Sequence, residues 1–126
     1  MITPEDLRYT EEHEWLKVED EAVILGITDF AQNSLGDVVF VDLPEIGTTA
    51  EAGDSIGSIE SVKTVAELFC PVAGEVIEIN EELEDRPELV NSAPYENGWM
   101  VKIKVDSSVL TSDKFMDSDA YADFIK

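Results

Sequence analysis

Apolar and polar residues alternate along most of this chain, and this period of two limits the fold more than any other feature. The alternation is strongest in seven short segments rich in Val, Ile and aromatic residues and bounded by Gly, Pro, Asn or Asp, which is the composition of strands and the turns between them. These segments are 13–18, 22–27, 37–43, 55–60, 65–70, 74–80 and 99–105. We therefore predict a mainly β protein.

Two short helices complete the predicted elements. The first covers residues 29–35: Asp29 can cap it, Gln32 sits where its side chain can reach back to the cap, and Gly36 can take the left-handed conformation that ends a helix. The second covers residues 119–124 and follows Ser118. We expect one short internal helix and one C-terminal helix.

The strands also form an internal repeat. The run 36–41 (Gly-Asp-Val-Val-Phe-Val) returns as 74–79 (Gly-Glu-Val-Ile-Glu-Ile), and 57–60 has a looser counterpart in 98–101. Two similar halves of about forty residues are predicted to pack face to face, as a small sandwich or hybrid barrel of two antiparallel sheets. Chance similarity is the alternative, because Gly-acid-Val-Val is a common start for a strand.

The chain is strongly acidic. Its 126 residues fit a single domain, 1–126, with 29 acidic against 8 basic residues and a formal net charge of −21. Nucleic acid and anionic membranes repel such a surface, so we expect neither as a partner, and we expect basic protein surfaces instead. A plainer explanation is that the charge keeps the protein soluble.

The compartment is expected to be the cytoplasm. Cys70 is the only cysteine, so no internal disulfide can form, which favours a reducing compartment. Residues 1–14 lack the basic start and apolar run of a leader, and no window of the sequence is apolar over the length of a membrane span.

Catalytic and metal-binding patterns are missing from the sequence. His13 is the only histidine, so a His-based metal cage cannot form, and Lys17 stands where a His-Glu-x-x-His motif needs its second histidine. Cys70 lies between Phe69 and Pro71, which favours a buried, unreactive thiol. No Gly-rich phosphate loop precedes a helix, and no Gly-x-Ser-x-Gly elbow occurs. We therefore predict that the chain is not an enzyme.

Lys63 is the candidate functional residue. It lies in the short connection between 55–60 and 65–70, which is typical of a tight hairpin with an exposed tip. Position alone would make it an ordinary surface lysine. Its flanks, Gly57-Ser58-Ile59-Glu60-Ser61-Val62-Lys63 and then Gly74-Glu75-Val76 eleven residues further on, resemble the lipoyl-attachment signature of the glycine cleavage H-protein family.

The resemblance covers nearly the whole chain. It includes Tyr9, Glu12-His13-Glu14-Trp15, Gly26-Ile27-Thr28, Ala31-Gln32, Leu35-Gly36-Asp37, Val39-Phe40-Val41, Leu43-Pro44, Pro71, Leu89-Val90-Asn91, Pro94-Tyr95 and Gly98-Trp99. The chain departs from the family just after the lysine. Many relatives carry Ala, a polar residue and Ser-Asp there, whereas this chain has Thr64-Val65-Ala66-Glu67.

The resemblance implies a carrier with no catalytic group of its own. Lipoate would be amide-linked to Lys63 by a lipoate ligase or an octanoyltransferase. The arm would take an aminomethyl group from a pyridoxal-phosphate glycine decarboxylase and deliver it to a tetrahydrofolate-dependent aminomethyltransferase. A dihydrolipoamide dehydrogenase would then reoxidise the arm.

The loaded arm should need a protective cleft. An aminomethyl group on a thiol is labile, and it is cationic when protonated, so its host should combine acids with apolar walls. Glu12, Glu14 and Glu67 supply acids, and Ile27 and Leu35 could supply walls. In the resembled family the loaded arm folds against the region that is 12–15 here. Two alternatives stay open: an H-like relay that donates lipoate to other enzymes, and an unmodified acidic interaction module.

Overall fold

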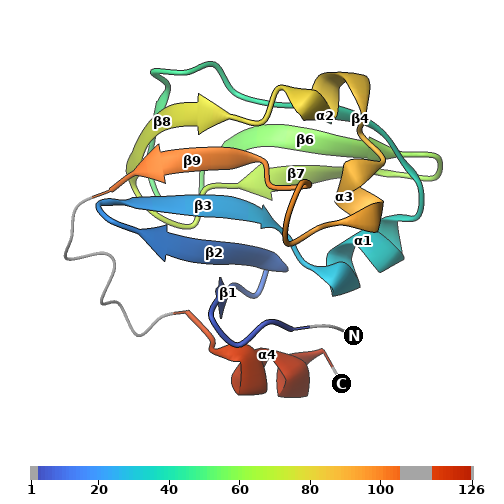
Figure 1. Cartoon of the computed structure of the whole chain (residues 1–126), viewed down its shortest axis with the longest axis horizontal. Coiled ribbons are helices and arrows are strands. Elements are labelled where there is room, and N and C mark those ends of the chain that lie inside the picture. Colours follow the sequence, from blue (N-terminus) through green and yellow to red (C-terminus); the bar gives the residue numbers. More distant parts are fainter. Residues whose placement is uncertain (1–2, 106–114, 126) are drawn as a thin grey trace.

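Two antiparallel sheets form the body of the protein in residues 3–105 and 115–125, the parts that the computed structural model describes (Figure 1). The larger sheet runs in the order β1 (Arg8–Tyr9), β2 (Glu14–Glu19), β3 (Ala22–Ile27), β9 (Val101–Lys104), β8 (Gly74–Ile79) and β5 (Thr49–Ala50). The smaller sheet runs β4 (Val38–Asp42), β6 (Ser55–Ser61) and β7 (Val65–Phe69). Every strand segment predicted from the alternation is therefore present, with shifts of a residue or two at some ends.

One hydrophobic core lies between the two sheets. Leu25 and Ile103 of the larger sheet pack in one buried cluster with Ile59 and Leu68 of the smaller sheet. Alternate residues of each strand supply these side chains, which is why the period of two was visible in the sequence. The predicted class is confirmed: the protein is mainly β with two antiparallel sheets, packed as a sandwich whose sheets do not close into a barrel.

The internal repeat has a structural counterpart. Its first half supplies the antiparallel pair β4–β6, and its second half supplies the pair β8–β9. Each pair has a register shift at the corresponding place, between Val38 and Phe40 in β4 and between Val76 and Glu78 in β8. The two halves lie in different sheets, so each covers the apolar face of the other.

The internal helix α1 (Asp29–Leu35) has the predicted bounds, but its predicted cap is wrong by one residue. Thr28 is the N-cap: its backbone is extended, and its hydroxyl accepts a hydrogen bond from the first turn of the helix. The Asp29 carboxylate instead accepts a bond from the Gln32 amide at 2.8 Å. Gly36 ends the helix at a positive φ of 80°, which suits glycine, but its ψ of −161° is not that of the predicted left-handed helical conformation.

Three further helices are present in the described residues. The C-terminal helix α4 (Ser118–Phe124) begins one residue before its predicted start, capped by Asp117, and packs on β1 below the larger sheet (Figure 1). The helices α2 (Glu82–Asp85) and α3 (Leu89–Ser92) were not predicted. The run 81–85 was expected to be a solvated loop, but one helical turn buries Leu83 fully while its acids face outward. None of the helices described is long and apolar enough to cross a membrane.

The Asn91 side chain joins three elements at one end of the smaller sheet. From α3, its oxygen accepts a hydrogen bond from the Val38 N–H at 2.8 Å. Its amide nitrogen donates to the Gly36 carbonyl at 2.9 Å and to the Gln32 side-chain oxygen at 3.0 Å. The end of α1 and the start of β4 are therefore held by a single amide group, which we call the Asn91 junction.

We predict that Asn91→Ala destabilises the fold. The substitution leaves the Val38 N–H and the Gly36 carbonyl without their side-chain partner, and we expect the free energy of unfolding to fall by about 2–4 kcal/mol. Asn33→Ala on the exposed face of α1 is the matched control, with an expected change within about 0.5 kcal/mol. Urea unfolding of both variants measures this. Equal stabilities for the two would contradict a structural role for the Asn91 junction.

Candidate functional site

Lys63 lies at the tip of the hairpin between β6 and β7, as predicted, and its side chain is exposed. The turn is closed by a hydrogen bond from the Ser61 N–H to the Thr64 carbonyl at 2.8 Å. The Ser61 hydroxyl accepts bonds from the backbone N–H groups of Lys63 and Thr64, at 3.3 and 3.1 Å. The Val62 N–H donates to the Asp37 carbonyl at 3.0 Å, which fastens the tip to the connection between α1 and β4. The backbone of the turn is therefore held on both sides of Lys63, and the exposed side chain extends from it.

The Lys63 side chain fits an amide-linked prosthetic arm. Its stem passes over Gly36, where a methyl group would lie 3.5 Å from Lys63 Cε. Within the described part of the chain, the lysine amine forms no ion pair. An amine that is exposed, unpaired and carried on a fixed turn can be reached and acylated without breaking any contact of the fold.

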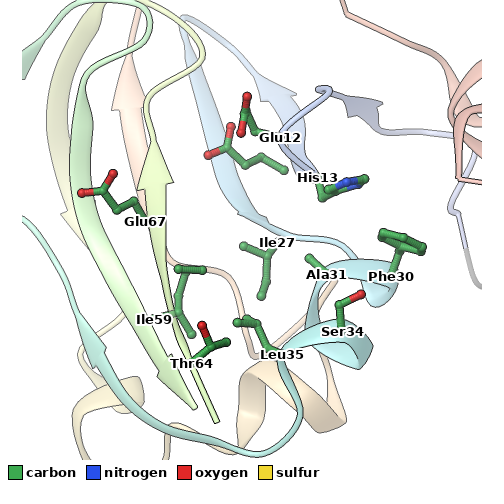
Figure 2. Close-up of a pocket in the computed structure, with 12 residues that line it drawn as sticks. Glu12, His13, Ile27, Phe30, Ala31, Ser34, Leu35, Ile59, Thr64 and Glu67 are labelled. Atoms are coloured by element: carbon green, nitrogen blue, oxygen red, sulfur yellow. The ribbon is translucent and has the colours of Figure 1, made fainter.

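A cavity of about 250 Å³ opens beside the hairpin, between the edge of β7, the helix α1 and the connection that precedes β2 (Figure 2). Its lining residues are Glu12, His13, Glu14, Ile27, Phe30, Ala31, Ser34, Leu35, Ile59, Thr64, Ala66 and Glu67. The five residues that the sequence assigned to an arm cleft, Glu12, Glu14, Ile27, Leu35 and Glu67, all line it. Because Thr64 follows Lys63 directly, the cavity begins next to the candidate attachment residue.

The walls of the cavity are largely apolar. Ile27, Leu35 and Ile59 are buried and come from β3, α1 and β6. Their side chains face the same space in Figure 2. Such walls limit the entry of water, and a polar contact inside them is stronger than it would be in solution.

Glu14 is the buried acid of this cavity. It is only 2% exposed. Its Oε2 accepts a hydrogen bond from the Phe69 N–H at 2.7 Å, and its Oε1 accepts one from the Thr10 hydroxyl at 3.3 Å. Burial raises the pKa of Glu14 to about 8, although both hydrogen bonds act in the opposite direction. The carboxyl group is therefore mostly protonated and neutral at pH 7.

The other two acids lie at the rim. Glu12 and Glu67 are both exposed. Glu67 pairs with Ser58 in the sheet register, and Figure 2 shows its carboxylate pointing away from Ile27 and Leu35. The three acids predicted for the cleft thus differ in kind: one is buried and neutral, and two are solvated.

The contact of the C-terminal helix with the lining of this cavity was not predicted. The Tyr121 hydroxyl of α4 lies 2.9 Å from His13 Nδ1 and 2.7 Å from the hydroxyl of Thr28, the cap of α1. His13 lines the cavity with a φ of 64°, and burial lowers its pKa. Phe30 and Ser34 were also missed, although their four-residue spacing places them on one face of α1.

Cys70 is buried and lies outside the cavity. Its thiol donates a hydrogen bond to the Val72 carbonyl at 2.8 Å, and burial raises its pKa. The thiolate form is therefore disfavoured, and the expected burial of Cys70 is confirmed.

Comparison with known proteins identifies the family. A family model described as Glycine cleavage H-protein matches residues 7–126. The chain belongs to the glycine cleavage H-protein family. The glycine cleavage system H protein of Bacillus cereus (strain AH820) is 55% identical over 98% of this chain and 96% of its own length. That of Listeria innocua serovar 6a is 57% identical, with 96% of each chain covered.

A solved structure agrees with this assignment. The crystal structure of the H protein from Mycobacterium marinum has a TM-score of 0.87 and 37% identity to this chain, covering 96% of this chain and 97% of the other. The resemblance found in the sequence is therefore confirmed. The chain is a lipoyl carrier protein of the glycine cleavage system.

We predict that Glu14 makes the stability of the protein depend on pH. The folded protein keeps the Glu14 proton up to about pH 8, whereas the unfolded chain releases it near pH 4.5. Between these values the unfolded state binds fewer protons, so the free energy of unfolding falls as the pH rises. Glu14→Gln should remove this contribution and flatten the profile.

Urea unfolding between pH 5 and pH 8 measures this prediction, with Glu12→Gln as the control because Glu12 is exposed. The control should keep the profile of the wild-type protein. If Glu14→Gln also kept it, the Glu14 carboxyl would not be held in its neutral form.

Proposed function

We propose that Lys63 is the lysine that carries the lipoyl group, and that the cavity beside it receives the loaded end of the arm. The observation that supports this most strongly is the juxtaposition of an exposed, unpaired amine with a cavity that combines apolar walls and a buried acid. The same hairpin supplies both features, because Lys63 stands at its tip and Thr64 lines the cavity.

The bound lipoyl group would supply the disulfide that accepts the aminomethyl group and the electrons. We propose three enzymes as partners of the arm: a pyridoxal-phosphate glycine decarboxylase, a tetrahydrofolate-dependent aminomethyltransferase and a dihydrolipoamide dehydrogenase. A lipoate ligase or octanoyltransferase would attach it. The protein's own part is binding, orientation and exclusion of water, so it is a carrier and not an enzyme. We propose the cytoplasm as its compartment, since its single cysteine is a buried free thiol.

The proton on Glu14 explains how the cavity can be stable both with and without cargo. A buried, unpaired carboxylate is costly, and the neutral form avoids that cost while the cavity is empty. A cationic amine that enters would lower the pKa of Glu14, so that the carboxyl group loses its proton and pairs with the cation. In both states the buried group and its surroundings carry no net unpaired charge.

The cavity favours the glycine cleavage role over the two alternatives. A relay that only passes lipoate to other enzymes has no cationic cargo and no need of a buried acid within reach of its lysine. An unmodified interaction module would need neither the free amine nor the cavity. The intact mass of the native protein tests the last alternative directly, because an unmodified module would carry no lipoyl group.

We predict that Lys63 is modified and that no other lysine is. The apo protein, incubated with a lipoate ligase, ATP and lipoic acid, should gain one lipoyl group, and peptide mapping should find it on Lys63. Lys63→Arg should stay unmodified and keep its stability within about 0.5 kcal/mol, since the side chain is exposed. Lys17→Arg is the matched control and should be modified normally. Modification at Lys17, Lys102 or Lys104 would contradict the proposal.

We also predict that Glu14 prolongs the lifetime of the loaded arm. The holo protein, loaded with its aminomethyl cargo and separated from all enzymes, should lose the cargo faster when Glu14 is replaced by Gln. A charge-assisted hydrogen bond contributes about 1.5–3 kcal/mol, which corresponds to a lifetime about tenfold shorter or more. Release of formaldehyde with time measures the decay. Glu12→Gln should have a smaller effect, because Glu12 is solvated. Equal decay of wild type and Glu14→Gln would show that the cavity does not hold the cargo.

A further inference from the structure

An exposed apolar surface surrounds the Lys63 turn. Val39, Phe40, Val62 and Val65 are 49%, 53%, 69% and 59% exposed, and we call these four residues the tip patch. Isolated apolar side chains on a surface are ordinary. These four lie on the turn that carries Lys63 and on the strands next to it, in a strongly acidic protein, and groups of exposed apolar side chains mark sites of interaction.

The tip patch exists because β4 is irregular. Val38 and Val41 are both buried. In a regular strand, alternate residues are buried, so Val39 would be exposed but Phe40 would be buried with Val38. The register shift between Val38 and Phe40 turns both Val39 and Phe40 outward.

The patch lies on the two outer strands of the smaller sheet, β4 and β7, and on the turn, with the exposed acid Glu60 of β6 between Phe40 and Val65. Phe40 lies opposite Glu60 in the register, and Glu60 lies opposite Val65. Residues paired in this way stand on the same face, so Phe40 and Val65 share the outer face of the sheet. Val62 continues this surface into the turn, next to Lys63.

The other half of the internal repeat shows that the fold does not require this patch. The corresponding register shift in β8 lies between Val76 and Glu78, and Glu78 occupies the position that matches Phe40. Glu78 is exposed, as Phe40 is. The irregular strand therefore accepts a charged residue at this place, and the aromatic side chain beside Lys63 has no role in the core.

We propose that the tip patch is the docking surface for the enzyme that acylates Lys63. This inference rests on the proposed function, because it takes Lys63 as the acylated residue. In the reaction, Lys63 Nζ attacks the carbonyl carbon of an activated acyl donor, an acyl adenylate or an acyl thioester. The N–C bond forms as the bond to the leaving group breaks with its electron pair, and the ammonium group gives up two protons to a base of the enzyme or to solvent.

The geometry of that reaction selects the acylating enzyme among the possible occupants. Its catalytic groups must reach Nζ itself, so it must cover the turn and the side chains next to it. Enzymes that act on the finished arm meet its far end, with the lysine stem and the acyl chain between them and the turn. They can work without contact to Phe40 or Val65.

The surface also indicates the chemistry of the partner. The strands β4, β6 and β7 carry no basic residue, the exposed acid Glu60 lies between Phe40 and Val65, and the exposed acids Asp37, Asp42 and Glu67 lie around them. A complementary face has an apolar pocket for Phe40 within a basic rim, since aromatic anchors dominate binding energy and rim charges guide association.

Acylation kinetics of the apo protein test the proposal, with a lipoate ligase, ATP and lipoic acid and with the carrier concentration varied. Phe40→Glu copies the residue found in β8 and should lower kcat/KM by about tenfold or more, chiefly through KM. Phe40→Leu keeps an apolar anchor and should stay within about threefold of wild type. Ile46→Glu is the matched control, because Ile46 is equally exposed but lies beyond the other end of β4, and its rate should not change. Thermal unfolding should show that all three variants are folded.

The outcomes separate this proposal from the proposed function. If wild type is not acylated at Lys63, both are wrong. If wild type is acylated and Phe40→Glu matches Ile46→Glu, the tip patch alone is wrong. The patch is also wrong as a site for the acylating enzyme if fully lipoylated Phe40→Glu loses glycine decarboxylation or reoxidation to the same extent. Conversion of a wild-type dimer to a monomer by Phe40→Glu would assign the patch to a second copy of the chain.

Discussion

The hydrogen bond from the Val62 N–H to the Asp37 carbonyl is the contact on which the site depends. Hydrogen bonds within a hairpin do not fix its tip relative to the rest of the fold, because a turn that projects from a sheet can bend together with its strands. This bond ties the tip to the connection between α1 and β4, and the Asn91 junction fixes that connection in turn. The Lys63 backbone and the α1 wall of the cavity are therefore joined by these contacts, so the fold sets the distance between them.

Electrostatics divides the site into an outer and an inner part. Outside, the chain carries a net charge of −21, and the proposed acylation of Lys63 would remove one of its few positive charges. This surface repels other acidic molecules and guides basic ones, and salt weakens both effects. Inside, Glu14 stays neutral because burial outweighs its two hydrogen bonds. Under the proposed function, this uncharged group would ionise at neutral pH when a cationic cargo enters the cavity.

Much of this could be predicted from the sequence, and the failures have physical causes. The strands were visible because each has one buried face, and α1 was visible because capping chemistry and Gly36 lie at its ends. The helices α2 and α3 are single turns with only one or two buried residues, too short to show a helical period. The sequence grouped the acids of the cleft but could not distinguish Glu14 from Glu12, since burial depends on strands that are distant in the chain. The contact between Tyr121 and Thr28 was invisible for the same reason.

The alternation that predicted the fold also lets one hairpin serve two purposes. Along the start of β7, Val65 and Glu67 face the outer surface of the sheet, as the register with Phe40 and Ser58 requires. Ala66, between them, lines the cavity. Under the function proposed for Lys63, one side of the strand would meet an enzyme that attaches the arm, while the other side would form a wall for what the arm carries. Because consecutive residues of a strand point to opposite faces, these two surfaces can both lie next to Lys63, and Glu67 at the rim of the cavity is the residue of β7 that belongs to both.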